Sequence, residues 1–144
     1  MGEKMKLKHV VVEKATFRNE ILKMKEREAR LMVIVGVQDR ENDKFQMIYS
    51  FEENHGDFTN IKVNFGWDDT IPSIQDIYIS AMLPEMEIVD LFDVKVEGVA
   101  HGLLLEPDKY GILRKKGADA KQPAAAAPPP QPAAKPPASP TGGA

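Results

Sequence analysis

The chain has 144 residues, a formal net charge of −3 at neutral pH and no cysteine. The negative charge argues against nucleic-acid binding, which needs a basic face, and the lack of cysteine excludes disulfides, a thiol nucleophile and self-ligated iron–sulfur clusters. The sequence has neither an apolar run of about 18 residues that could span a membrane nor the apolar core of a secretion signal, so we expect a cytoplasmic protein.

The first predicted elements are a short strand and an amphipathic helix. The apolar run His9–Val12 predicts the strand. Thr16–Ala29 predicts the helix, with Thr16 as its N-cap. The apolar residues of this segment recur at helical spacing: Phe17, Ile21 and Met24. Because this apolar stripe is narrow, the helix is expected to lie over one face of a sheet.

Three strands are predicted next. Leu31–Val37 is a nearly continuous apolar run, typical of a strand buried on both faces, in which Gly36 would mark a bulge or a close approach. Two segments with alternating apolar residues follow: Phe45, Met47, Tyr49 and Phe51, then Ile61, Val63 and Phe65. Short, turn-rich connections favour an antiparallel meander. The expected fold is therefore α+β, with a helix packed on a small, mostly antiparallel sheet.

A short acidic helix is predicted to begin at Pro84, where the missing backbone N–H does no harm. Its expected buried face consists of Ile88, Leu91 and Phe92. Glu85 and Glu87 would lie in the first turn, where the helix dipole favours carboxylates. A short strand around Val94 and Val96 and an extended C-terminal segment are expected after it.

Helical geometry places Glu87 and Asp90 on one flank of this helix and points Glu85 elsewhere. If the flank is buried, its two charges need a cationic or hydrogen-bonding partner. That partner could be Arg30, Arg114 or another protein. The alternative is a solvated acidic edge.

Composition divides the chain near Gly117. Residues 118–144 contain eight of the eleven prolines, many alanines and no aromatic residue. Such a segment cannot bury enough apolar surface to offset the entropy of ordering it, so a disordered Ala/Pro-rich tail is predicted. Residues 1–117 are expected to form one α+β domain.

No catalytic, cofactor-binding or metal-binding residue is predicted in this chain. His9, His55 and His101 lie far apart in the sequence, and none has a second histidine at helical spacing. Glu87 and Asp90 alone provide too few ligands for a metal. No nucleophile accompanies the carboxylates, and residues 73–76 are explained as a cap and turn.

Two short motifs carry a family resemblance. They comprise Ile71, Pro72, Ser73 and Asp76 in the first, and Glu85, Glu87, Asp90 and Phe92 in the second. This pattern resembles the C-type subunit of NADH–quinone oxidoreductase (complex I) and its relatives in energy-converting, membrane-bound nickel–iron hydrogenases. The resemblance covers roughly residues 30–105. Met86 replaces the arginine, and Asp93 the glycine, that the respiratory proteins usually carry, which favours the short hydrogenase version, like the D-type subunit of an Ech-type hydrogenase.

The resemblance implies a cofactor-free accessory subunit on the cytoplasmic side of the cell membrane, held there peripherally by partner subunits. It would stabilise a hydrogenase-like large subunit, next to a small iron–sulfur subunit, in a complex that passes electrons from a reduced carrier to protons. These partners would carry the nickel–iron centre and the iron–sulfur clusters. The eight motif residues would form or support the partner interface. The alternatives are the C-type subunit of a quinone-linked complex and an autonomous binding module with a small-molecule pocket near Trp67.

Overall fold

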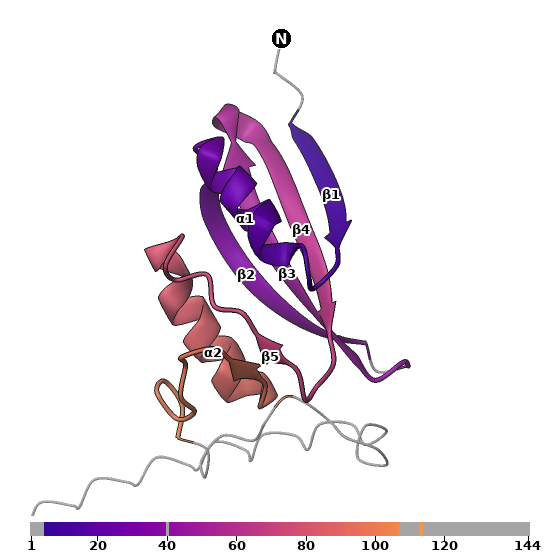
Figure 1. Ribbon diagram of the computed structural model, residues 1–144, viewed down its shortest axis with the longest axis vertical. Coiled ribbons are helices and arrows are strands. Elements are labelled where there is room, and N and C mark those ends of the chain that lie inside the picture. The colour runs from indigo at the N-terminus through magenta and orange to yellow at the C-terminus, as the bar shows by residue number, and fades with distance from the viewer. Residues whose placement is uncertain (1–4, 40, 107–112, 114–144) are drawn as a thin grey trace, which may run out of the picture.

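The computed structural model describes residues 5–39, 41–106 and 113. A four-stranded sheet forms its centre, and helices lie on one side of that sheet (Figure 1). The N-terminal elements are β1 (Lys6–Val12), α1 (Phe17–Glu26), β2 (Arg30–Asp39), β3 (Lys44–Glu53), the short 3-10 helix η1 (Asn54–Gly56) and β4 (Asp57–Phe65). The remaining elements are β5 (Thr70–Ile71), the 3-10 helix η2 (Ile79–Ala81), α2 (Met82–Phe92) and β6 (Lys95–Val96). The α+β fold is confirmed. The expected tail and the basic residues near Arg114 lie outside the described residues.

The strand order is β1-β4-β3-β2, and the predicted meander of β2, β3 and β4 is confirmed by two antiparallel pairings. β1 begins at Lys6, earlier than predicted, and pairs in parallel with β4. The helix α1 connects β1 to β2 and returns the chain to the end of the sheet from which it started, which makes these two strands parallel. β3 and β4 then fill the space between them.

The core lies between the sheet and its two helices. The alternating residues of β3 predicted to face inward are fully buried: Phe45, Met47, Tyr49 and Phe51. From α1, the ring of Phe17 lies 4.8 Å from that of Tyr49, and from α2, Phe92 lies 5.2 Å from Phe45. Burying each large apolar side chain contributes about 1.5–3 kcal/mol, so this inner face anchors both helices.

β2 differs from its prediction because it is an edge strand with one open face. Val33, Val35 and Val37 are 41–45% exposed, whereas Leu31 and Ile34 are buried. The expectation of burial on both faces was wrong, since an apolar run does not reveal whether a second layer covers it. The register shifts between Leu31 and Val33, which marks a bulge.

Gly36 confirms the expected close approach. A Cβ atom at this position would lie 2.9 Å from Cζ of Phe45 and 3.0 Å from Cε2 of Phe92. The bare backbone of β2 therefore allows the ring of α2 to pack against the sheet.

Both helices begin or end at places the sequence did not indicate. α1 stops at Glu26 rather than Ala29, because Glu28 adopts a left-handed conformation (φ 59°) and the N–H of Ala29 donates to the carbonyl of Met24. Thr16 is the N-cap, but its hydroxyl donates to the carbonyl of Glu13 instead of accepting from the helix.

α2 begins at Met82, two residues before the predicted Pro84. Ile88 and Val89 are buried on it, while Leu91 and Phe92 are only half-buried. Within the part of the chain that the structure describes, no helix is long and apolar enough to cross a membrane.

Candidate functional site

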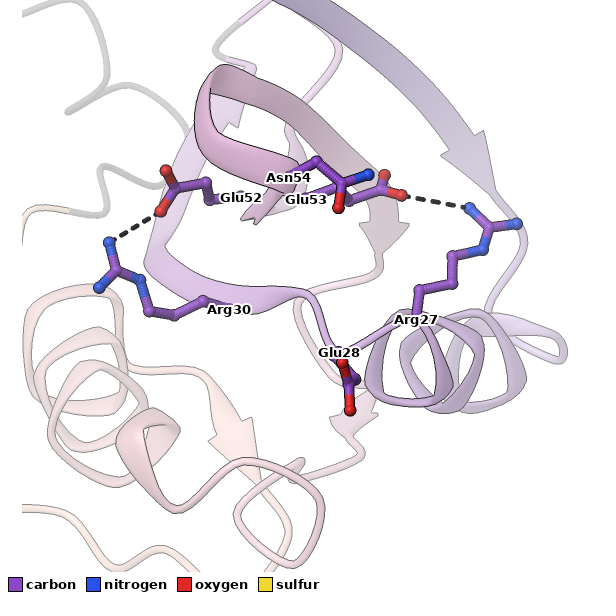
Figure 2. Close-up of a pocket in the computed structure, with 6 residues that line it drawn as sticks. All are labelled: Arg27, Glu28, Arg30, Glu52, Glu53 and Asn54. Carbon is purple, nitrogen blue, oxygen red and sulfur yellow. Dashed lines mark hydrogen bonds and ion pairs between the residues drawn. The ribbon is translucent and has the colours of Figure 1, made fainter.

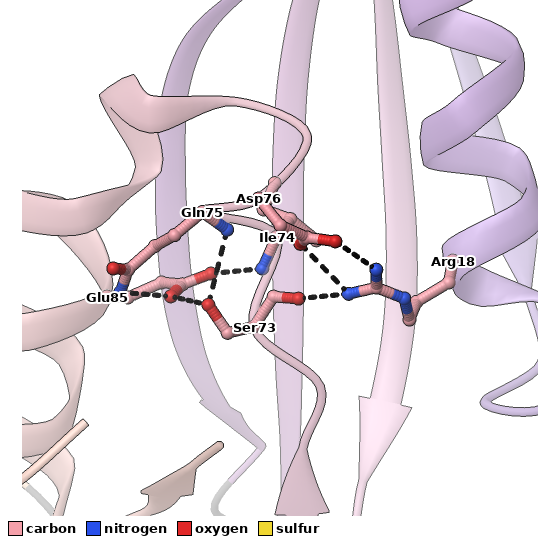
Figure 3. Close-up of polar contacts among 6 residues, drawn as sticks. All are labelled: Arg18, Ser73, Ile74, Gln75, Asp76 and Glu85. Atoms are coloured by element: carbon pink, nitrogen blue, oxygen red, sulfur yellow. Dashed lines mark hydrogen bonds and ion pairs between the residues drawn. The ribbon is translucent and has the colours of Figure 1, made fainter. Parts of the chain in front are cut away.

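The two motifs of the sequence lie next to each other in space. The first runs from the end of β5 into the loop of residues 72–78, and the second belongs to α2. Figure 3 shows residues of the loop, of α2 and of α1 joined by one set of polar contacts. The contacts between the two motifs therefore hold α2 against the loop, and we call this set of polar contacts the device that fixes α2.

Glu85 is the centre of this device. Its side chain is 1% exposed. It accepts hydrogen bonds from the Ser73 hydroxyl (2.7 Å), the backbone N–H of Ile74 (2.9 Å) and the side-chain amide of Gln75 (2.9 Å). A buried carboxylate is tolerated only when such donors replace water, so Glu85 locks the first turn of α2 onto the loop.

The prediction placed Glu85 in the first turn and away from the flank of Glu87 and Asp90, but it did not include the burial of Glu85. Glu85 precedes Ile88 by three residues and Phe92 by seven, so it shares their face of the helix. This spacing was visible in the sequence and could have revealed its burial. The donors that make the burial possible come from the loop and could not be read from the helix.

Arg18 of α1 holds the other side of the same loop. Its guanidinium donates to the backbone carbonyl of Ser73 and to both carboxylate oxygens of Asp76, at 3.3 and 2.6 Å. Hydrogen bonding to Arg18 lowers the pKa of Asp76, and the same bond raises the pKa of Arg18. No sequence signal singles out Arg18 from the other charged residues of α1. The expected turn at residues 73–76 is confirmed, with Ser73 also accepting from the backbone of Gln75 at 3.2 Å.

Asp90 and Glu87 have different environments. Asp90 accepts backbone N–H groups of Gly102, Leu104 and Leu105 at 2.6, 2.8 and 3.0 Å. Burial opposes its charge, but these three donors together outweigh that effect and lower the pKa of Asp90. Glu87 is exposed and makes no hydrogen bond or ion pair with the described residues.

The partner of Asp90 is thus the backbone of residues 102–105, which the sequence did not indicate. Arg30, one of the two arginines proposed for this role, instead pairs with Glu52 at 2.7 Å (Figure 2). Arg114, the other, lies outside the described residues.

The remaining motif residues pack into the core. Ile71 is buried, Pro72 is half-buried, and Phe92 packs on Phe45. Of the eight motif residues, Glu87 and Asp76 are exposed, and Asp76 is held by Arg18. Glu87 is therefore the motif side chain left for another molecule.

Exposed apolar side chains precede Glu87 in η2 and at the start of α2. Ile79 of η2 is 76% exposed, and Met82 and Leu83 of α2 are 38% and 58% exposed. Leu83 and Glu87 are four residues apart and so neighbours on the helix surface. We call these four residues the α2 patch. An apolar group of this kind beside an unpaired charge is typical of a protein-contact surface.

Two hollows lie away from the motif. One, of about 370 Å³, is lined by the ion pairs Arg27–Glu53 (3.7 Å) and Arg30–Glu52, which face each other across it (Figure 2). The other, of about 680 Å³, lies beside residues 11–15 and Asn64. Trp67 lines neither of them.

Trp67 itself is a core residue, 8% exposed. Its indole N–H donates to the carbonyl of Asp43 at 2.9 Å, and its ring packs on Phe45. Among the described residues, no group of three or more metal-binding side chains comes together.

Comparison with known proteins identifies a matching family and a solved structure of similar fold. The family described as "Respiratory-chain NADH dehydrogenase, 30 Kd subunit" matches residues 10–120, a range that includes both motifs. A chain in the "Structure of the membrane-bound sulfane sulfur reductase (MBS), an archaeal respiratory membrane complex" is similar in fold, with a TM-score of 0.66 and 20% identity over 76% of this chain and 68% of that one. No curated protein matches the sequence.

Proposed function

The chain belongs to the family of the respiratory-chain NADH dehydrogenase 30 Kd subunit, and from this premise we propose that it is a cofactor-free accessory subunit of a membrane-bound respiratory oxidoreductase. Its role is to dock on and stabilise the large catalytic subunit. This role is supported by the difference between the motif residues that are bonded within the chain and the one that is exposed and unbonded within the described residues. Glu85, Ser73 and Asp90 are bonded inside the chain, and Glu87 is presented outward.

The α2 patch is the proposed contact with the large subunit. Glu85 and Arg18 fix the loop and α2 before any partner binds, so docking does not have to order them, which lowers the entropy cost of association. Ile79 and Leu83 supply exposed apolar area, and Glu87 supplies a charge that a lysine or arginine of the partner would meet. Ile71, Pro72, Asp76 and Phe92 support this surface from within.

In finer detail we propose the energy-converting hydrogenase type, with a nickel–iron centre in the large subunit and iron–sulfur clusters in neighbouring subunits. Electrons would pass from a reduced carrier to protons, on the cytoplasmic side of the membrane. The support is the set of departures from the respiratory pattern, Met86 and Asp93. Asp93 has φ 54°, a left-handed conformation that favours the glycine usual there. The quinone-linked complex is the second candidate, because the matching family is described as part of a respiratory-chain NADH dehydrogenase.

Affinity purification of the tagged chain from native membranes tests the proposal. Recovery with subunits that contain nickel and iron–sulfur clusters supports the hydrogenase type, whereas recovery with a flavin-containing, NADH-oxidising unit supports the quinone-linked type. A chain recovered alone, as an autonomous binding module would be, contradicts both.

A charge reversal tests the α2 patch itself. Glu87→Arg should reduce the recovered complex about tenfold or more, because like charges facing each other in an interface cost several kcal/mol. Glu26→Arg, an exposed carboxylate on α1, is the matched control and should leave recovery unchanged. Both variants should unfold at the wild-type urea concentration. Wild-type recovery of the Glu87→Arg complex would show that the patch is not the contact.

A further inference from the structure

One face of the sheet is left without a covering layer by the described residues. Phe17 of α1 packs on Tyr49, and Phe92 of α2 packs on Phe45, so both helices lie on the face to which the odd-numbered residues of β3 point. Figure 1 shows the two helices on the same side of the sheet. We call the opposite side the open face.

The two edge strands of the open face expose more apolar side chains than is usual for a surface in water. Antiparallel sheets with one solvated face normally place polar residues outward. Here the outward side chains of β2 are Val33, Val35 and Val37, each 41–45% exposed, and β1 adds Leu7 and Val11 at 59% and 69%. These apolar groups lie on the two edge strands, and the strands between them carry Ile48 but also the polar side chains Gln46, Ser50, Asn60 and Asn64. Exposed apolar groups of this kind on one face indicate a contact surface.

A cation, Lys62, lies at the centre of this face. The strand register aligns Val35, Ile48, Lys62 and Val11 in one row across all four strands. Lys62 is half-buried and makes no ion pair or hydrogen bond with the described residues. Once the face is covered, an unpaired ammonium group between apolar side chains would be strongly unfavourable, so whatever covers the face must bring a carboxylate to it.

The position of Lys62 also decides between occupants. In a symmetric contact between two copies of the chain, the centre of the face meets itself. Two Lys62 side chains would then oppose each other in a poorly solvated place, which is destabilising. The charge therefore favours a different polypeptide over a second copy.

We propose that the open face is a second protein-binding surface, separate from the α2 patch, and that it receives an apolar surface of another subunit with an aspartate or glutamate opposite Lys62. This inference rests on the proposed function, because that subunit belongs to the same complex. The chain would thus be held between two neighbours and not attached to one.

The test is carbodiimide cross-linking of the complex purified through the tagged chain, because carbodiimide joins an amine to a carboxylate only when the two are in contact. We expect an amide bond between Lys62 and an acidic residue of another polypeptide, identified by mass spectrometry. Lys62→Arg keeps the charge, so it should preserve the complex and abolish the cross-link.

A substitution in the apolar row provides an independent measure. Val35→Lys should reduce the recovered complex about tenfold or more, the effect of losing roughly 1.4 kcal/mol of association free energy. Leu22→Lys is the matched control, since Leu22 is 44% exposed but lies on α1. Equal urea midpoints of the two isolated variants would show that Val35→Lys acts on binding and not on folding.

Each other result overturns the inference in a recognisable way. If Lys62 is acetylated as readily in the complex as in the isolated chain, the face is uncovered, although the recovered subunits still uphold the proposed function. A cross-link to residues 107–144 of this chain, or to a second copy, identifies a different occupant. A chain recovered alone with reactive Lys62 refutes both the function and this inference.

Discussion

Replacing Glu85 with alanine should destabilise the chain far more than its single carboxylate suggests. The substitution removes the acceptor for three donors, the hydroxyl of Ser73, the backbone N–H of Ile74 and the side-chain amide of Gln75. Ile74 is fully buried, so its N–H cannot turn to water. The loop and the first turn of α2 would lose the contact that holds them together.

The size of the effect follows from the burial of each donor. An unsatisfied buried donor costs about 1–3 kcal/mol, and the N–H of Ile74 should approach that full value. Ser73 and Gln75 are only half-buried and can recover part of their bonds from water. Together we expect a loss of about 3–5 kcal/mol, from one full penalty and two partial ones. Glu85→Gln should cost less, because its amide oxygen can still accept from Ile74.

Urea unfolding followed by circular dichroism measures these differences, with Glu87→Ala as the control. Glu87 is on the same helix but exposed and unbonded within the described residues, so its removal should change the unfolding free energy by less than about 0.5 kcal/mol. The expected order of destabilisation is Glu85→Ala, then Glu85→Gln, then Glu87→Ala. Equal losses for Glu85→Ala and Glu87→Ala would refute the argument that Glu85 is the buried lock.

Three further substitutions test other parts of the fold by the same unfolding measurement. Gly36→Ala should destabilise by about 1–3 kcal/mol, because its Cβ would come within 2.9 Å of the buried ring of Phe45; an unchanged midpoint would mean that the ring moves freely. Tyr49→Phe should leave stability unchanged or raise it by up to about 1 kcal/mol, since the buried Tyr49 hydroxyl has no hydrogen-bond partner among the described residues; a clear loss would reveal an unseen partner such as water. Because Arg18 lowers the pKa of Asp76 in the folded chain, Asp76 stabilises fully above its unfolded pKa of about 3.9 and loses that contribution as the pH falls through the lower folded value. Asp76→Asn should therefore flatten the acid side of the stability–pH curve, and an unaltered curve would contradict the pairing.

The spacing of apolar residues correctly predicted which side chains of β3 and α1 are buried. The alternation of Phe45 to Phe51 and the helical spacing of Phe17, Ile21 and Met24 identified the core face of β3 and of α1. Each of these patterns is local, and each places apolar residues on one side only. The ends of the helices were harder to predict from the sequence. α1 ends just before Glu28, which adopts a left-handed conformation, and glycine is the residue that usually signals such an end.

The sequence-based predictions failed where burial or a contact depends on residues far away in the sequence. Residues 31–37 of β2 are apolar or glycine, and only the position of the helices shows that its valines are uncovered. The two motifs lie next to each other in space, but the pairing of Ser73 with Glu85 and of Arg18 with Asp76 joins separate segments of the chain. Sequence spacing carries no information on such contacts.

The parallel pairing of β1 with β4 has a consequence for the order in which the chain folds. β2, β3 and β4 can pair through short turns. β1 instead pairs with β4, and α1, β2 and β3 lie between these two strands in the sequence. Lys6 is opposite Asp57 and Val12 is opposite Val63. Forming this pair requires closure of a long loop, which is entropically costly until the hairpins have shortened the distance. We therefore expect β1 to join last in refolding and on the ribosome, where β1 is synthesised before its partner β4 and must wait for it.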